Sequence, residues 1–321
     1  MKIIVQFSGG KDSLACLLWA INTYKKENII AIFCDTGIES PKTYQHIKEV
    51  IDRLQVEFIV LKGEKNFYEL AEYKKRFPST KARFCTEFLK IRPFINFILN
   101  YKQHTIIIQG IRAEESKSRA KMQAECTYFK YYFQPYTNNS MKVTDLLEIK
   151  KIKPLTIIQD KLLKALEARL VLGKEDCKFH TYRKKEIIEF CKEYATDIQR
   201  PFFTQTANEV MKYILDNGFK PNPLYYEGFK RVGCFPCIMA NQSEIKLIAN
   251  NYPDKIKEIE IEENKNGHTY FAPTYIPKRF CSNKNYPTIQ DVVNYVQREN
   301  TNIFKTEENI KSCMSIYNIC E

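Results

Sequence analysis

The chain has 321 residues, 44% of them hydrophobic and 13% aromatic, which is enough to build one or two folded domains and excludes a disordered chain. Its net charge of +12 favours anionic partners such as nucleotides or nucleic acid, although lysine enrichment of genomic origin gives the same balance. No apolar run reaches the roughly 20 residues that span a bilayer, and the first residues lack a signal-peptide pattern. We therefore expect a cytoplasmic protein with no membrane contact.

The N-terminal part alternates between apolar runs typical of strands and segments with helical periodicity. We expect strands at 2–7, 29–35, 57–62 and 105–110, and helices at 14–25, 40–54 and 84–101, with Pro93 marking a kink or break. This alternation predicts an α/β fold with a doubly wound parallel sheet. Ligands of such sheets bind beyond the carboxyl ends of the strands, where SGGKDS (8–13), DTG (35–37) and QGIR (109–112) lie. The three loops predict one site.

The pattern is less regular from residue 113 onward. The charged segment 113–120 is predicted as a loop over this rim of the sheet. Helices are expected at 157–173, 204–219, 241–252 and 287–299, and a charged, solvated stretch is expected at 257–267. Asn241 or Ser243 is the expected cap of the third of these helices.

The SGGKDS loop has the composition of an anion site. Gly9 and Gly10 let the backbone approach an anion closely, the following helix offers unpaired N–H groups, and Lys11 adds positive charge. The loop matches neither the P-loop nor the dinucleotide pattern, so a purely structural turn is the alternative for the loop taken alone.

SGGKDS resembles the PP-loop of ATP pyrophosphatases and of phosphoadenylyl-sulfate (PAPS) reductases. Four further segments are similar to that superfamily in the same order, namely DTGIESPKTY (35–44), FCTEFLKIRP (84–93), QGIRAEESKSR (109–119) and NEVMKYILDNGFKPNPLYYEGFKRVGCFPC (208–237). The chain is thereby identified as a member of the PAPS reductase-like branch. The resemblance implies a HUP-like, adenine nucleotide alpha-hydrolase-like sheet over residues 1–240, followed by a small helical or irregular extension over 241–321.

The resemblance also implies a set of nucleotide-binding residues. The phosphate end of the nucleotide is expected at Ser8, Gly9, Gly10, Lys11, Asp12 and Ser13. Asp35 and Thr36 are expected near the adenosine, and Gly110 and Arg112 on the opposite wall. Arg119 is expected either to reach an anionic group or to be a solvated loop charge. Of these, Lys11, Asp12 and Arg112 are the expected catalytic residues.

Two cysteines in GCFPC suggest a metal centre. Cys234 and Cys237 place two thiolates on a tight turn, which suits zinc or an Fe–S cluster, and a closed site usually has four ligands. Cys85 lies where adenylyl-sulfate reductases carry cluster cysteines, although those enzymes have two adjacent cysteines and this chain has Phe84 before Cys85.

The fourth ligand is less constrained. Cys281 is the preferred choice because Lys278 and Arg279 would offset cluster charge, while Cys313 and Cys320 are the other candidates. We therefore expect a [4Fe-4S] cluster at Cys85, Cys234, Cys237 and Cys281, with a zinc site or free thiols as alternatives.

Three functions are compatible with this resemblance. PAPS and adenylyl-sulfate reductases use a cysteine in a C-terminal Glu-Cys-Gly-(Leu/Ile)-His tail, whereas this chain ends in SCMSIYNICE. We therefore favour an ATP pyrophosphatase that uses Mg²⁺ and supports sulfur transfer to DNA or tRNA, with a sulfur-donor protein as partner. An oxidoreductase that reduces (phospho)adenylyl sulfate with an external thiol is the first alternative, and a non-catalytic nucleotide- or cluster-binding subunit is the second. The oligomeric state stays open.

Overall fold

A computed structural model describes residues 1–80, 82–117, 119–126, 151, 154, 182–194, 196–282 and 286–298. No helix in these ranges is long and apolar enough to cross a membrane. The predicted helix at 157–173 and the candidate ligands Cys313 and Cys320 lie outside the described residues.

A six-stranded sheet forms the centre of the N-terminal part, in the order β3-β2-β1-β4-β6-β5. Its strands are β1 (Lys2–Gln6), β2 (Ile29–Asp35), β3 (Glu57–Lys62), β4 (Thr105–Ile108), β5 (Glu125–Cys126) and β6 (Thr196–Gln199). All neighbouring pairs are parallel except β5 with β6. The chain builds outward from β1 to β3 and then returns to place β4 beside β1. The loops after β1 and β4 therefore flank the switch point, where α/β sheets bind ligands.

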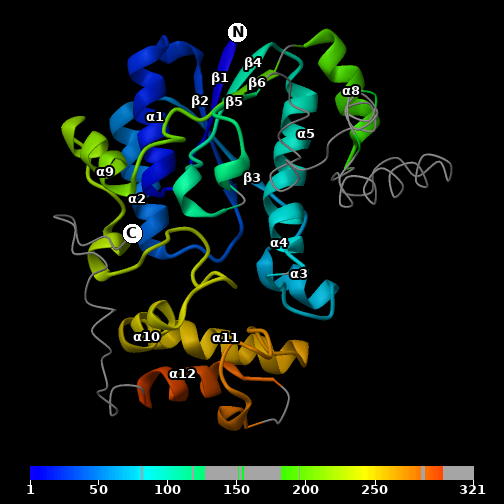
Figure 1. The fold of residues 1–321 in the computed structure, drawn as a ribbon, viewed down its shortest axis with the longest axis vertical. Helices are drawn as coiled ribbons and strands as arrows, with labels where there is room; N and C mark the ends of the chain where they lie inside the picture. Colours follow the sequence, from blue (N-terminus) through cyan, green and yellow to red (C-terminus); the bar gives the residue numbers. More distant parts are fainter. Residues whose placement is uncertain are drawn as a thin grey trace.

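Helices cover both faces of the sheet, which confirms the predicted doubly wound α/β fold (Figure 1). One face packs against α1 (Lys11–Thr23), α2 (Pro41–Leu54) and α9 (Ala207–Asp216), and the other against α5 (Arg92–Tyr101) and α8 (Lys184–Glu193). Successive strand residues point to opposite faces, so Ile3 joins the first core and Ile4 the second.

The predicted helix at 84–101 contains a local widening. It comprises α4 (Phe84–Thr86), a π-helical turn (Glu87–Ile91) and α5. Pro93 is the second residue of α5, directly after the π-helical turn, so its missing N–H falls where the hydrogen-bond pattern changes from π-helical to α-helical. The π-helical turn takes the place of the kink or break expected at Pro93.

Three helices, α10 (Gln242–Asn251), α11 (Pro253–Asn266) and α12 (Ile289–Arg298), form a group below the sheet in Figure 1. Asn241 caps α10 with a capping box, as one of the two predicted caps. The stretch expected to be solvated at 257–267 is largely exposed, but it is helical, as part of α11, and its Ile259 and Glu263 are buried. These helices share a core with α3 (Phe67–Tyr73), so the domain boundary near residue 240 stays a prediction.

Five short 3-10 turns complete the described elements, at Lys26–Asn28, Ala113–Glu115, Arg119–Lys121, Pro223–Glu227 and Lys278–Phe280.

Candidate functional site

The SGGKDS loop is held open at the start of α1. Gly9 has a φ of +74°, and a Cβ there would lie 2.9 Å from Ile47 Cγ1. The Ser13 hydroxyl donates to the Gly10 carbonyl at 2.9 Å and accepts from the Ser8 N–H at 3.1 Å. Gly10 is the N-cap of α1 and supplies no side-chain cap, so the first turn of α1 has the features of an anion site.

Gly110 brings the loop after β4 against the same helix end. A Cβ at Gly110 would lie 2.7 Å from the Ser13 nitrogen and 2.7 Å from the Asp12 carbonyl carbon. Only glycine permits this approach, which joins the first and third of the predicted loops at one place.

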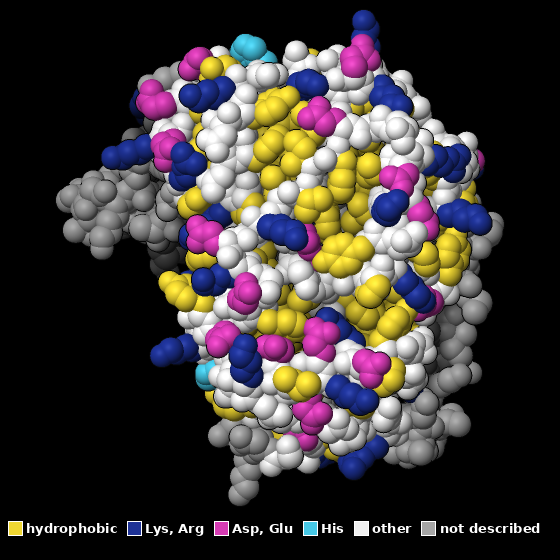
Figure 2. Space-filling view, turned by 180° about the vertical axis from the view of Figure 1, so that it is seen from behind, with side chains coloured by type: hydrophobic (Ala, Val, Ile, Leu, Met, Phe, Trp, Pro, Cys, Tyr) yellow, Lys and Arg dark blue, Asp and Glu magenta, His cyan; other side chains and the backbone are white. Residues whose placement is uncertain are grey.

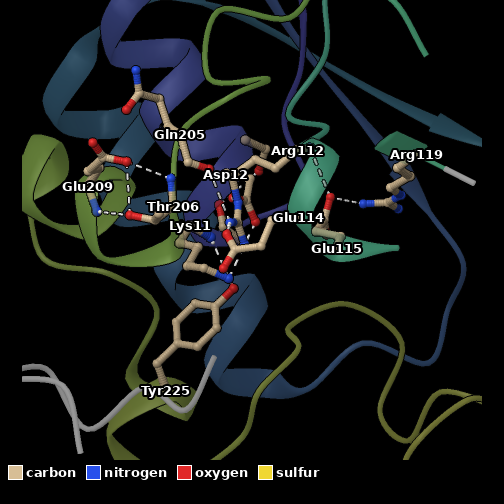
Figure 3. A network of polar contacts seen from close by, with 12 residues as sticks. Lys11, Asp12, Arg112, Glu114, Glu115, Arg119, Gln205, Thr206, Glu209 and Tyr225 are labelled. Atoms are coloured by element: carbon tan, nitrogen blue, oxygen red, sulfur yellow. Dashed lines mark hydrogen bonds and ion pairs between the residues drawn. The ribbon is translucent and has the colours of Figure 1, made fainter. Parts of the chain in front are cut away.

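A charge network fills the space between these two loops (Figure 3). Arg112 Nε donates to Asp12 Oδ1 at 2.5 Å, and Lys11 Nζ lies 3.5 Å from Asp12 Oδ2. Arg112 is only 4% exposed and also pairs with Glu114. Burial lowers the pKa of Arg112, but Asp12 and Glu114 outweigh it and the pKa is raised. The Arg112 guanidinium is thus paired with Asp12 and Glu114, and its place on the wall of a nucleotide site stays a prediction.

Arg119 lies on the same rim and pairs with a carboxylate of the chain. Its guanidinium contacts Glu115, whose Oε2 also accepts from the Arg112 backbone N–H at 3.0 Å. The Arg119 side chain is half-buried, so its ion pair with Glu115 is partly exposed to solvent.

The segment that carries NPLY lies against the loop. The Lys11 N–H donates to the Tyr225 hydroxyl at 3.1 Å, and Lys11 Nζ lies 5.2 Å from the centre of the Tyr225 ring. Asn222 is fully buried and donates to the Gly9 carbonyl at 3.3 Å and to Thr43 at 3.2 Å. Tyr225 and Asn222 therefore fix the loop against α2.

The polar side chains of the DTG loop form hydrogen bonds within the protein. Asp35 Oδ1 accepts from the Gly37 N–H at 2.9 Å and from the Tyr44 hydroxyl at 2.7 Å. Burial opposes ionisation of Asp35, but these hydrogen bonds and Lys62 leave its pKa below the usual value. Thr36 is buried and donates to Glu39 at 2.7 Å, so its side chain is committed within the protein.

The GCFPC turn packs directly on the DTG loop. Glu39 and Cys234 form an isolated antiparallel bridge, and the Thr36 hydroxyl lies 3.5 Å from Cys234 Sγ. Burial raises the pKa of the Cys234 thiol to about 11, while the nearby Lys90 ammonium lowers it. The pKa of the Lys90 ammonium is raised, and Cys234 is the largest cause. Burial lowers this pKa, whereas Glu39 and Cys237 raise it further.

Three of the four predicted metal ligands interact electrostatically. Burial raises the pKa of the Cys85 thiol and Cys237 raises it further, and Cys237 also raises that of Cys234. Burial raises the pKa of Cys281 as well, but its charged neighbours are Asp291 and Lys278. Among the described residues, no group of three or more His, Cys, Asp or Glu side chains is close enough to hold a metal ion.

Several residues of this site were not singled out from the sequence. Tyr225, Asn222 and Lys90 lie in segments quoted for the family resemblance, and that position was the available signal. Glu39 and Glu115 also lie in quoted segments, at 35–44 and 109–119, but the contacts that give them a place in this site arise from the tertiary structure.

Residues 2–240 match the sequence profile of the phosphoadenosine phosphosulfate reductase domain. An uncharacterized protein of Methanocaldococcus jannaschii is 26% identical over 252 residues, covering 78% of this chain and 39% of that protein. A 37.8 kDa uncharacterized protein of Escherichia phage 186 is 25% identical, covering 86% of this chain and 80% of its own length. The chain thus spans well under half of the archaeal relative.

Two solved structures are similar in outline. PAPS reductase from Candida auris, in a phosphate complex, has a TM-score of 0.42 and 15% identity over 74% of this chain and 83% of its own. The U34-tRNA thiolase of Methanococcus maripaludis with its [4Fe-4S] cluster has a TM-score of 0.34 and 17% identity over 99% of this chain and 77% of its own. The match over residues 2–240 shows that the chain belongs to the phosphoadenosine phosphosulfate reductase domain family.

Proposed function

We propose that the protein is an ATP pyrophosphatase that activates an acceptor on nucleic acid for sulfur transfer. The observation that carries the proposal is the start of α1, where the N-cap Gly10 supplies no side chain and the Lys11 ammonium lies beside the Asp12 carboxylate. An acceptor oxygen attacks the α-phosphorus of ATP, the bond from that phosphorus to the bridging oxygen breaks, and pyrophosphate leaves with the electron pair. Hydrosulfide from a donor protein then displaces AMP from the acceptor carbon.

The chain's own groups suit the first of these steps. The first-turn N–H groups of α1 and the Lys11 ammonium bind the leaving pyrophosphate and stabilise its developing charge. Gly110 and the Ser13 hydroxyl hold the shape of the loop, and Arg112 keeps the Asp12 carboxylate in place.

Mg²⁺ fits the oxygen donors at this site. Asp12 and Glu114 are adjacent carboxylates that both contact Arg112, and Mg²⁺ commonly uses one or two carboxylates together with substrate phosphates. When bound, the ion would neutralise charge on the phosphates.

The cysteines carry a separate part of the proposal. We propose that Cys85, Cys234 and Cys237 are thiolate ligands of a [4Fe-4S] cluster or zinc, although the three side chains would have to move closer together to bind it, and that the Lys90 ammonium offsets their charge. A bound cluster would supply soft iron sites for sulfur. The charged neighbours of Cys281 lie in the C-terminal helices, so we propose that Cys281 is not a ligand.

The test of the nucleotide step is pyrophosphate release from ATP with Mg²⁺ and single-stranded nucleic acid. Lys11→Ala should lower the rate at least about 100-fold, because it removes a cation that stabilises the leaving group. Lys48→Ala is the matched control, since Lys48 is an exposed lysine that pairs with Asp52 on α2. Reduction of adenylyl sulfate to sulfite by the pure protein with thioredoxin, without pyrophosphate release, would overturn the proposal.

The test of the thiol centre is the iron, sulfide and zinc content after anaerobic purification. Cys234→Ser should lose the metal, while Cys281→Ser and Cys16→Ala should retain it, because Cys16 lies in the core of α1. Metal retained by Cys234→Ser would refute this ligand set.

A further inference from the structure

A basic and aromatic surface follows the end of α3. Between Tyr73 and Phe84 the sequence YKKRFPSTKARF contains five Lys and Arg residues and no Asp or Glu. In Figure 1 this part of the chain, α3 and α4, lies between the sheet and the helices α10 to α12. We define the basic–aromatic surface as Lys65, Tyr73, Lys74, Lys75, Arg76 and Arg83.

Cations and aromatic rings alternate on this surface. Tyr73 is 63% exposed, and the Nζ atoms of Lys65 and Lys74 each lie 5.3 Å from the centre of its ring. Lys74 Nζ is also 4.4 Å from the centre of the Phe88 ring. Exposed rings on which bases stack, set among cations that contact phosphates, are the features by which proteins bind single strands.

Three cations of the surface, Lys74, Lys75 and Arg76, are available for a partner. The nearby carboxylates are used elsewhere, since Glu72 pairs with Lys265 and Glu87 pairs with Arg92. Within the part of the chain that the structure describes, Lys74, Lys75 and Arg76 take part in no ion pair.

The turn that presents these cations is fixed by the backbone. Lys75 has a φ of +52°, and its N–H donates to the Glu72 carbonyl at 3.0 Å. The Arg76 N–H donates to the Ala71 carbonyl at 3.1 Å. These bonds end α3 in a left-handed turn and leave Lys75 and Arg76 exposed to solvent.

The charges are mixed on the face that Figure 2 draws. Figure 2 shows a face on which Lys and Arg are interspersed with Asp and Glu around a gathering of hydrophobic side chains. One end of the surface also lies near Cys85. Arg83 Nη2 donates to Thr86 Oγ1 at 3.2 Å, and Thr86 follows Cys85 in α4.

We propose that the basic–aromatic surface binds a single-stranded polynucleotide. One base stacks on Tyr73, and the phosphates of the strand contact Lys74, Lys75 and Arg76. The inference deepens the proposed function, because it assigns the surface that receives the acceptor strand. A strand bound there extends toward Cys85, and so toward the residues proposed to handle sulfur.

The experiment measures binding of a fluorescein-labelled single strand of about 16 nucleotides by anisotropy, without ATP, at several salt concentrations. Tyr73→Ala should weaken binding about tenfold at every salt concentration, because it removes a stacking platform. The triple variant Lys74→Gln, Lys75→Asn, Arg76→Gln should weaken binding and reduce the salt dependence by about 0.7 per cation lost. Asn replaces Lys75 because it tolerates the left-handed conformation.

Matched controls separate this surface from general charge. The triple variant Lys25→Gln, Lys26→Gln, Lys220→Gln removes three exposed lysines elsewhere, and Tyr286→Ala removes a tyrosine that is 50% exposed. Both should bind the strand like the parent protein. Equal losses in the control and test triples, or equal binding of a duplex of the same sequence, would overturn the inference. Competition by polyglutamate as effective as that by the unlabelled strand would assign the surface to an acidic protein and also overturn it.

ATP binding, followed by thermal shift, distinguishes this inference from the proposed function. The surface variants should bind ATP normally, because no substituted residue touches the SGGKDS loop. Normal ATP-dependent stabilisation with no strand binding would refute the surface alone. Strand binding without any ATP effect would refute the proposed nucleotide chemistry alone.

Discussion

Carboxylates of the chain hold the cations of the nucleotide site. Asp12 contacts Lys11 and Arg112, and Glu115 contacts Arg119 on the rim. An incoming phosphate must therefore compete with these carboxylates for positive charge. The competition is strongest at buried Arg112 and weakest at Arg119, whose side chain is half-buried.

Replacement of Glu115 tests whether Arg119 serves the ligand. Glu115→Gln should tighten ATP or pyrophosphate binding by about threefold to fivefold, because Arg119 is released to contact an anion. The dissociation constant from isothermal titration measures the effect. Glu186→Gln is the matched control, since it breaks a similar surface pair with Arg183. Unchanged or weaker binding in Glu115→Gln would show that Arg119 is a solvated loop charge.

Single residues of the site were predictable where a local motif carried them. Ser8 to Ser13, Gly110 and Arg112 were predicted from the family resemblance and its order along the chain, and the structure brings them together at the start of α1. Their part in binding stays a prediction. The commitment of Arg112 to Asp12 was not predictable, because it depends on the distance between two loops that are 100 residues apart in the chain.

The contact between the loop after β4 and the start of α1 sets the geometry of the site at the scale of elements. β4 pairs with β1 in register, with Ile4 opposite Ile107 and Val5 opposite Ile108. This pairing directs the chain at Gly110 onto the first turn of α1. Any side chain there would push the two elements apart.

Gly110→Ala should therefore lower the free energy of unfolding by about 1–3 kcal/mol, because its Cβ meets backbone atoms that do not move aside easily. It should also weaken ATP binding. Gly10→Ala is the structural comparison, since its Cβ would have no contact closer than 3.4 Å and should change stability little. Urea unfolding measures both variants, and equal stability of the two would contradict the proposed close approach.

The elements themselves were predicted well where periodicity was strong. β3 begins and ends at the predicted residues, and α2 begins within one residue of the prediction. α11 was missed because its buried face consists of only Ile256, Ile259 and Glu263 within a highly charged segment. A buried glutamate cannot be recognised from periodicity, since a carboxylate is normally counted as solvated.

At the scale of the whole molecule, two hydrophobic cores are joined by the segment 222–238. Tyr225 packs in the core of the sheet, whereas Leu224 and Phe235 pack in the core shared with the C-terminal helices. The nucleotide loop and the thiols are thus supported by one continuous stretch of chain. Glu263 stabilises the core shared with the C-terminal helices, because it accepts from the Tyr270 N–H at 2.6 Å and from the Ile289 N–H at 2.9 Å.

Glu263 predicts a dependence of stability on pH. Burial raises its pKa from 4.5 to about 7, although the two N–H groups lower it. The folded protein therefore binds more protons than the unfolded chain between these values, so this group's contribution is full at acidic pH and is lost as pH rises toward 7. We expect a loss of about 2 kcal/mol from this site across that interval.

The measurement is urea unfolding as a function of pH. Glu263→Gln should be less stable at acidic pH, because it loses one acceptor, and should show a flatter decline toward neutral pH. Glu49→Gln, on the exposed side of α2, should keep the parent slope. If the stability of Glu263→Gln fell with pH as steeply as that of the parent protein, the Glu263 carboxyl would not be the source of the pH dependence.

The π-helical turn at Glu87–Ile91 acts as a spacer that sets the angular phase between Cys85 and α5. Each residue of a regular helix advances by about 100°, so removing one residue from the turn would swing α4 by about that angle while α5 stayed packed on the sheet. The thiol of Cys85 would then face away from Cys237. The π-helical turn thus sets the direction in which α4 presents Cys85 relative to α5.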